Sequence, residues 1–234
     1  LHHYAGLARG GAGLVIVEAT AVSPEGRISP GCTGLWNDQQ AEGMARIAQA
    51  IKAGGAVPGI QIAHAGRKAS ANRPWEGDDH IADGDARGWQ TISPSAIAFG
   101  GDLSKVPQEM SLADIHRVTA DFAAAAQRAR AAGFEWLELH FAHGYLAQSF
   151  FSTHANQRTD QYGGNLENRS RFLAGIPLGR FCTPKDVAAA ALYLASLPLF
   201  ERGGWLSTPC APTGPRFWPC PAPVSRPWRC LKMR

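Results

Sequence analysis

The stretch GLVIVE, at residues 13–18, is the first of three short apolar runs that decide the fold. VPGIQI follows at residues 57–62, and FEWLELH follows at residues 134–140. Apolar runs of this length are typical of strands that are buried on both faces of a sheet. We therefore expect three interior strands of one parallel sheet.

Two helical patterns separate these runs. Between the first and the second run, residues 40–53 place Met44, Ile47 and Ile51 at helical spacing. Between the second and the third, Ser111 is suited to cap a long Ala-rich helix over residues 112–132. An alternation of strand and helix predicts βαβ units, so the expected fold class is α/β with a parallel sheet.

Polar residues accompany the end of each run. Glu18 ends the first, Gln61 and His64 lie in and just after the second, and His140 and His143 close the third. In parallel α/β proteins, reactive groups gather at the carboxyl ends of the strands. Polar residues also begin wherever a buried strand ends, so the pattern alone leaves both a functional edge and an ordinary strand boundary open.

Four longer segments carry a more specific signal. In chain order they read GGAGLVIVEATAVSPEGR at 10–27, GIQIAHAGRK at 59–68, HFAHGYL at 140–146 and NQRTDQYGGNLENR at 156–169. Together, in this order and spacing, they resemble the old yellow enzyme family of FMN-dependent ene-reductases. The resemblance covers residues 1–173 and is strongest to the bacterial NADPH dehydrogenase branch of that family.

The resemblance implies an incomplete (β/α)8 TIM barrel that binds FMN at the carboxyl ends of its strands. It implies that the main chain of Ala19 approaches the flavin and that Gln61 hydrogen-bonds the pyrimidine edge of the ring. His140 is implied to contact the cofactor and, with His143, to grip the carbonyl oxygen of the substrate. Tyr145 is implied to be the proton donor, and no metal ion is expected.

These residue types suit the reduction of an activated C=C bond. In such a reaction, FMN that has been reduced by NAD(P)H delivers hydride to the β-carbon, and negative charge develops on the carbonyl oxygen of the substrate. Two imidazole N–H groups aimed at that oxygen stabilise the charge. A phenol on the opposite side is a suitable acid for the α-carbon. The predicted function is therefore an FMN-dependent NAD(P)H oxidoreductase acting on unsaturated carbonyl compounds.

Other interpretations of the same residues stay open at this point. A metal pair of His140 and His143 with His154 is one alternative, although metal-binding histidines on helices favour i, i+4 spacing. His140 and His143 are also compatible with a structural role in which main-chain groups satisfy each ring. We interpret Arg67 and Lys68 as surface or loop-anchoring charges.

The remaining sequence differs in character from the first 173 residues. Residues 174–196 resemble the carboxyl-terminal helical segment of short-chain dehydrogenases, in PLGRF at 177–181 and PKDV at 184–187. Residues 197–234 hold eight of the sixteen prolines and three of the seven tryptophans, and no strand or helix period persists there. We expect this last stretch to be disordered or poorly packed.

The opening strand of the barrel and its second half, with the phosphate-binding loops, are not recognised in this sequence. We therefore expect the chain to bind FMN weakly or not at all. The alternative function is a non-catalytic, truncated or chimeric fragment that associates with other chains through open strand edges. A homo-oligomer is one form that such association would take.

Charge and composition exclude several classes of protein. Hydrophobic residues make up 45% of the chain and charged residues 18%, as in ordinary globular proteins. The net charge is +4, but residues 197–234 alone carry +5, which leaves −1 for the other 196 residues and no basic stripe for nucleic acid. No apolar run approaches the roughly 20 residues of a membrane helix. With only Cys32 and Cys182 before the tail, the expected location is the cytoplasm.

Overall fold

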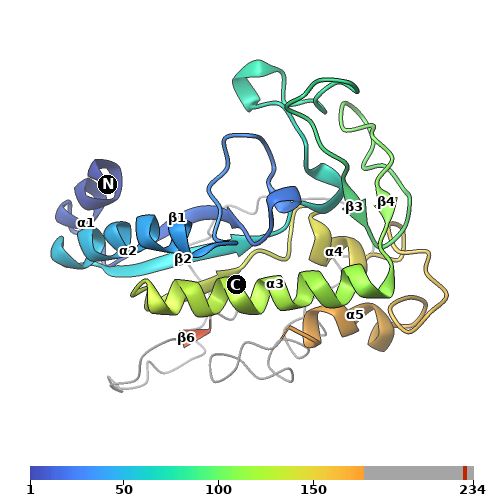
Figure 1. The fold of residues 1–234 in the computed structure, drawn as a ribbon. Helices are drawn as coiled ribbons and strands as arrows, with labels where there is room; N and C mark the ends of the chain where they lie inside the picture. Colours follow the sequence, from blue (N-terminus) through green and yellow to red (C-terminus); the bar gives the residue numbers. More distant parts are fainter. Residues whose placement is uncertain (177–228, 231–234) are drawn as a thin grey trace, which may run out of the picture.

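The computed structural model describes residues 1–176 and the pair 229–230 (Figure 1). The short-chain-dehydrogenase-like helix predicted within 174–196 lies almost entirely outside the described residues, as does most of the tail. The strands are β1 (Leu14–Ala21), β2 (Val57–Ala63), β3 (Ile92–Ser93), β4 (Gln108–Glu109), β5 (Trp136–Leu139) and β6 (Arg229–Cys230). The helices are α1 (His2–Arg9), α2 (Asp38–Ala53), α3 (Leu112–Ala131), α4 (Leu146–Phe151) and α5 (Leu166–Ala174), with 3-10 turns η1 (Pro24–Gly26), η2 (Gly66–Lys68) and η3 (Pro74–Glu76).

The main sheet is parallel and has the strand order β1-β2-β5-β6. The three predicted strands are confirmed as β1, β2 and β5, with ends that differ from the expected ones by a few residues. In the register of β2 and β5, Gln61 lies opposite Glu138. The carboxyl ends of β1, β2 and β5 therefore lie along one edge of the sheet.

Helices α1, α2 and α3 form one layer against this sheet. Helix α2 packs against both α1 and α3, and each of the three helices also contacts a strand. Both predicted helices are confirmed, and the Ser111 hydroxyl caps α3 by accepting from the Asp114 N–H at 3.1 Å. The pattern of parallel strands with an outer helical layer is that of consecutive βα units of a TIM barrel.

The segment between β2 and α3, residues 64–111, makes a long excursion beyond the strand ends. It contains η2, η3 and the two-stranded parallel sheet of β3 and β4, and it rises above the body of the molecule in Figure 1. Helix α4 contacts both η2 and β3. The excursion is thereby brought over the loop that follows β5.

The hydrophobic core lies between the sheet and the helices. It contains strand residues such as Val17 and Ile60, neither of which is exposed at all. On the side of α4 and α5, the rings of Phe150 and Phe172 stack with their centroids 4.4 Å apart. Phe122 of α3 meets Phe172 edge to face at 6.4 Å, so the three helices share one aromatic cluster.

Strand β6 differs from the expectation for the tail. Arg229 and Cys230 pair in parallel with Trp136 and Leu137 of β5, although residues 197–234 were expected to build no ladder. Neither Arg229 nor Cys230 is proline, so both retain the N–H group that a ladder needs. For the rest of the tail, disorder stays a prediction.

Candidate active site

The carboxyl ends of β2 and β5 hold a polar group of side chains. The Gln61 amide donates a hydrogen bond to the Glu138 carboxylate on the neighbouring strand. His140 follows β5, and its main-chain N–H donates to the Ile62 carbonyl at 3.0 Å, which extends the ladder by one step. Because Glu138 and His140 are two residues apart, their side chains leave β5 on the same face.

The chain turns sharply after His140. The Tyr145 N–H donates to the Ala142 carbonyl at 3.1 Å, and His143 adopts a φ of 59°. A positive φ is uncommon for a residue other than glycine and recurs at functional sites, where the fold maintains the local strain. The turn brings the His143 ring back over His140, with centroids 4.8 Å apart.

The hydrogen bonds fix how the two imidazoles share their protons. His140 Nδ1 accepts from the Ala142 N–H at 3.4 Å, so in the neutral ring the proton sits on Nε2. That Nε2 lies 3.2 Å from His143 Nδ1. The His140 Nε2–H therefore points toward His143 Nδ1.

His140 is neutral at physiological pH. Burial lowers its pKa to about 4, and the nearby His143 and Lys68 add to the effect because they disfavour a further positive charge. A neutral imidazole is a hydrogen-bond donor that brings no charge of its own to the site. It stabilises negative charge only as that charge develops.

Tyr145 completes a cluster of three rings. Its ring centroid lies 4.7 Å from that of His140 and 6.2 Å from that of His143. The side chain is buried and packs on Ala65 and Ala69 of the loop after β2. Burial raises the pKa of Tyr145 to about 12, with Cys32 and Asp78 contributing, so the hydroxyl keeps its proton and gives it up only to a strong base.

Ala19 lies at the end of β1, where the pairing with β2 is irregular. The register shifts between Val17 and Thr20, so that Glu18 and Ala19 bulge from the ladder. The Ala19 carbonyl accepts a long hydrogen bond of 3.5 Å from the Thr33 hydroxyl. A bulge of this kind redirects the main chain at a strand end, which leaves Ala19 partly exposed.

The structure thus brings His140, His143 and Tyr145 into direct contact. Gln61 lies on the adjacent strand, and Ala19 lies one strand further along the same edge. The possible metal site with His154 is not seen: no group of three or more His, Cys, Asp or Glu side chains placed to hold a metal ion occurs among residues 1–176. His154 is exposed and lies beyond α4.

Two cations at this edge, Arg67 and Lys68, were expected to be surface or loop-anchoring charges, and Arg67 takes the second of these roles. It is only 8% exposed, and one guanidinium nitrogen donates to the carbonyls of Ile97 and Ala98 at 3.3 and 3.0 Å. Lys68 Nζ lies over the rings of Phe99 and Tyr145, at 4.5 and 5.6 Å from the centroids.

The contact between Lys68 and Phe99 depends on the path of the 64–111 excursion, so no sequence pattern predicts it. Glu138 was also missed as the partner of Gln61. The only available signal was that Glu138 and Gln61 are both polar residues inside apolar strand runs, where a buried polar group needs a partner.

A further set of contacts supports the loop after β2. The buried His64 accepts from the Gly66 N–H at 3.0 Å through Nδ1 and has its Nε2 3.9 Å from Glu25. Its main-chain carbonyl accepts from the Leu146 N–H, also at 3.0 Å, which fastens this loop to the residue after Tyr145. A Cβ on Gly26 would lie 2.8 Å from the His64 ring, so only glycine fits there. His64 is thus a positioning residue.

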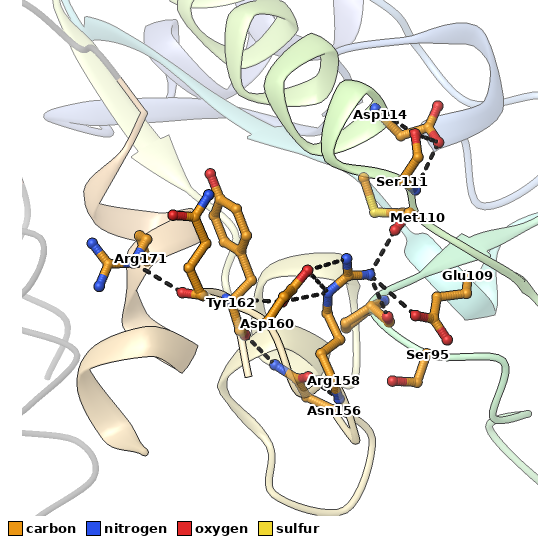
Figure 2. Close-up of polar contacts among 12 residues, drawn as sticks. Ser95, Glu109, Met110, Ser111, Asp114, Asn156, Arg158, Asp160, Tyr162 and Arg171 are labelled. Carbon is orange, nitrogen blue, oxygen red and sulfur yellow. Dashed lines mark hydrogen bonds and ion pairs between the residues drawn. The ribbon is translucent and has the colours of Figure 1, made fainter. Parts of the chain in front are cut away.

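The fourth segment that carried the resemblance is structural rather than catalytic. Figure 2 shows Arg158 at the centre of its polar contacts, between Asp160 and the β3–β4 excursion. One guanidinium nitrogen donates to the carbonyls of Pro94 and Met110 at 2.9 and 2.6 Å, and the other pairs with Asp160 at 2.6 Å. Asn156 donates to the Phe150 and Tyr162 carbonyls, both at 2.7 Å.

A parallel sheet with an outer helical layer, and a donor cluster at its carboxyl edge, define a segment of an enzyme-type (β/α) barrel. The family described as NADH:flavin oxidoreductase / NADH oxidase matches residues 1–176. The chain belongs to this family, and the resemblance to old yellow enzymes is confirmed.

Curated relatives agree with this assignment. The chain is 45% identical over 178 residues to an NADH:flavin oxidoreductase of Gibberella zeae, covering 75% of this chain and 43% of the relative. It is 48% identical over 171 residues to an NADPH dehydrogenase of Bacillus velezensis, covering 73% of this chain and 46% of the relative. The chain therefore spans about half the length of the curated relatives that it matches.

Solved structures support the fold. The Old Yellow Enzyme from Pichia sp. aligns with a TM-score of 0.64 and 31% identity, over 74% of this chain and 45% of that one. Morphinone reductase in complex with tetrahydroNAD aligns with a TM-score of 0.63 and 32% identity, over 80% and 50%. The incomplete (β/α)8 barrel predicted from the sequence agrees with these alignments.

Family membership implies FMN as the cofactor and NAD(P)H as the reductant. The residues present fit one edge of a flavin ring: Gln61 offers an amide beside the acceptor Glu138, and the bulge frees main-chain groups at Ala19. No helix among the described residues combines the length and the hydropathy needed to cross a membrane.

Proposed function

We propose that this chain supplies the carbonyl-binding and proton-donating side of an FMN-dependent oxidoreductase. Its reaction would be the reduction of activated C=C bonds in unsaturated carbonyl compounds by NAD(P)H. The observation that carries the proposal is the mutual contact of His140, His143 and Tyr145 at the carboxyl end of β5. Because the chain spans only part of the length of its relatives, the activity itself is a proposal.

When bound, FMN would supply the redox chemistry, the transfer of two electrons as hydride from NAD(P)H to the β-carbon of the substrate. Gln61 and the main chain at Ala19 are the groups that would hold the ring, with His140 at its side. The protein's own contribution is to place the substrate oxygen and to deliver a proton.

The two imidazoles would bind the carbonyl oxygen. The Nε2–H of His140, which lies 3.2 Å from His143 Nδ1, would turn to the oxygen, and His143 would be the second donor. As hydride arrives at the β-carbon, the C=C electron pair moves toward the carbonyl and charge builds on its oxygen. Preorganised donors lower the energy of this charged state more than that of the neutral substrate.

Tyr145 would then protonate the α-carbon. With a pKa of about 12, its hydroxyl stays protonated in the resting site and is acidic enough for an enolate carbon. Transfer of that proton re-forms the carbonyl and leaves the saturated product. Water returns the proton to the phenolate afterwards.

The test is steady-state reduction of 2-cyclohexenone by the full chain, with NADPH and with FMN in excess because weak retention is expected. Tyr145→Phe should slow alkene reduction by about 100-fold or more, the usual contribution of a general acid. It should leave reduction of the flavin by NADPH unchanged. The matched control is Tyr162→Phe, which removes the same hydroxyl from a buried tyrosine that packs on Phe150, 6.2 Å away and outside the site.

The alternative is that the chain is a non-catalytic fragment of such an enzyme. The observation that favours it is the outer edge of β1, which pairs with no further strand of the main sheet among the described residues. No flavin-dependent turnover at any FMN concentration, together with no change in the FMN spectrum on mixing, would favour this alternative and overturn the first proposal.

Two further properties belong to the same proposal. We propose the cytoplasm as its location, because Cys32 is a free thiol and the family-like segment is poor in cysteine.

Self-association through the β1 edge remains a proposal, and sedimentation of the purified chain measures it.

A further inference from the structure

A cavity of about 420 Å³ lies beside the ring cluster. Arg67, Lys68 and Phe99 line it on the side of the 64–111 excursion, and His143, Gln148 and Ser149 line it on the side of the β5 loop and α4. His140 and Tyr145 are not among its lining residues. The cavity thus begins at His143 and extends away from the place proposed for the reacting carbonyl.

The two cations on its wall form no close ion pair. No carboxylate of the described residues lies within 4.0 Å of Arg67 or Lys68, and Asp78 acts on Lys68 only from beyond that distance. Eleven Lys or Arg pairs with a carboxylate within 4.0 Å occur elsewhere in residues 1–176. Arg67 is more than nine-tenths buried, and its Nε has no hydrogen-bond partner. Lys68 is half-buried, and a charge withdrawn from water is costly unless an opposite charge compensates it, so an anion in the cavity would be stabilised by both side chains.

The wall is held in place rather than free to swing into solvent. The Arg67 guanidinium is fixed by the Ile97 and Ala98 carbonyls, and it lies 5.3 Å from the Phe99 ring centroid. The same ring lies 4.5 Å from Lys68 Nζ. A Cβ on Gly144 would lie 2.5 Å from Phe99, so the glycine lets the ring close over the turn. Burial lowers the pKa of both cations, and for Lys68 it outweighs the opposing effect of the more distant Asp78.

We propose that this cavity is a subsite for an anionic group, a carboxylate or a phosphate, held by Lys68 and Arg67 with hydrogen bonds from Gln148 and Ser149. The proposal rests on the proposed function only for the source of the anion. One source is an acidic substituent of the unsaturated substrate, whose carbonyl lies at His140 and His143. The other is a phosphate of the nicotinamide dinucleotide.

The binding of inorganic phosphate to the purified full chain, without FMN or reductant, tests the subsite directly. Calorimetric titrations are run at fixed ionic strength, because exposed charges respond to salt. Lys68→Met should weaken phosphate binding about tenfold or more, the value of one charge-assisted hydrogen bond. The matched control is Lys52→Met, which removes a lysine that pairs with Glu135 at 2.7 Å, far from the cavity.

Equal phosphate affinity in the wild type, Lys68→Met and Lys52→Met would overturn the proposal, as would equal losses in the two variants. Should Lys68→Met fail to fold, Gln148→Leu tests the same cavity from the opposite wall and should also weaken phosphate. Because this experiment measures binding and not turnover, a negative result would contradict the subsite but not the proposed reaction. Equally, a lack of alkene reduction would not affect the phosphate-binding result.

Two organic probes then separate the sources. Cinnamate carries a carboxylate on an unsaturated chain, and NADP⁺ carries the dinucleotide phosphates. A loss of affinity in Lys68→Met for cinnamate alone assigns the subsite to the substrate, and a loss for NADP⁺ alone assigns it to the reductant. A loss for neither probe would contradict the proposal even where phosphate binds.

Discussion

Lys68 and His140 influence each other through space, since the positive charge of Lys68 is one reason why the His140 ring stays neutral. Burial is the larger reason, followed by His143. We expect Lys68→Met to raise the pKa of His140 above its value of about 4, but not to the ordinary 6.5, because burial and His143 remain. An NMR titration of the histidine Cε1–H signals measures this shift, with His140→Gln used to assign the resonance.

The same titration has a clear control. Lys52→Met removes an equal charge from the far end of α2 and should leave the His140 pKa where it is. An unchanged pKa in Lys68→Met would contradict the coupling. A saturating anion in the proposed subsite should act like the mutation, because it cancels the Lys68 charge without removing the side chain.

At the scale of whole elements, Arg158 fastens the β3–β4 excursion to the segment after α4. Its side chain is 6% exposed, donates hydrogen bonds to the carbonyls of Pro94 and Met110, and forms an ion pair with Asp160. Arg158→Met would leave the partly exposed Asp160 carboxylate and two main-chain carbonyls without this donor. We expect a loss of about 3 kcal/mol in the free energy of unfolding, measured by urea titration.

Arg171→Met is the matched control for this loss. Arg171 also donates to a carbonyl, that of Gln161 at 2.9 Å, and pairs with Glu167 at 3.6 Å, but its side chain is 41% exposed. Water replaces those partners, so the cost should be about 1 kcal/mol or less. Similar losses in the two variants would show that burial does not account for the contribution of Arg158 to the free energy of unfolding.

The elements differ in how well the sequence predicts them. Strands β1, β2 and β5 were predictable because their runs are apolar, and α3 because Ser111 caps it. Helix α4 was not, since it has six residues and no side-chain cap. Short helices are stabilised by packing on their neighbours, which a local pattern does not contain.

The site divides in the same way. His140, His143 and Tyr145 lie within six residues, so a single turn brings them together and the family motif locates them. The Gln61–Glu138 contact needs the register of two strands that are far apart in sequence. The burial of Arg67 needs the path of residues 97–99, which no periodicity describes. The sequence therefore predicts the part of the site that lies within one turn of the chain, but not the contacts between segments that are distant in sequence.

At the scale of the whole molecule, shifted pKa values make the stability of the chain depend on pH, and His140, Glu25 and Tyr145 are three of the groups that contribute. His140 has a lowered pKa, so below pH 6.5 its ring is protonated in the unfolded chain but stays neutral in the folded chain down to about pH 4. Stability therefore falls between these two pH values. Burial raises the pKa of Glu25, but the closeness of His64 and Arg117 holds it well below its ordinary 4.5, so stability falls again in stronger acid. Tyr145 has a raised pKa, and stability falls from pH 10 to about 12 as the unfolded phenol ionises.

The acid side of this profile offers the sharpest whole-molecule test. Between pH 6.5 and about 4 the urea midpoint of the wild type should fall steadily, because folding excludes the proton from His140. His140→Gln should reduce the slope of this part of the profile. It should leave the share of His80, whose pKa burial also lowers, and the decline below pH 4.5, to which Glu25 contributes. His154→Gln, which alters an exposed histidine, should keep the wild-type slope. If His140→Gln and the wild type lose stability in parallel down to pH 4.5, the ring is not held neutral by the fold, and the donor role proposed for its Nε2–H loses its electrostatic basis.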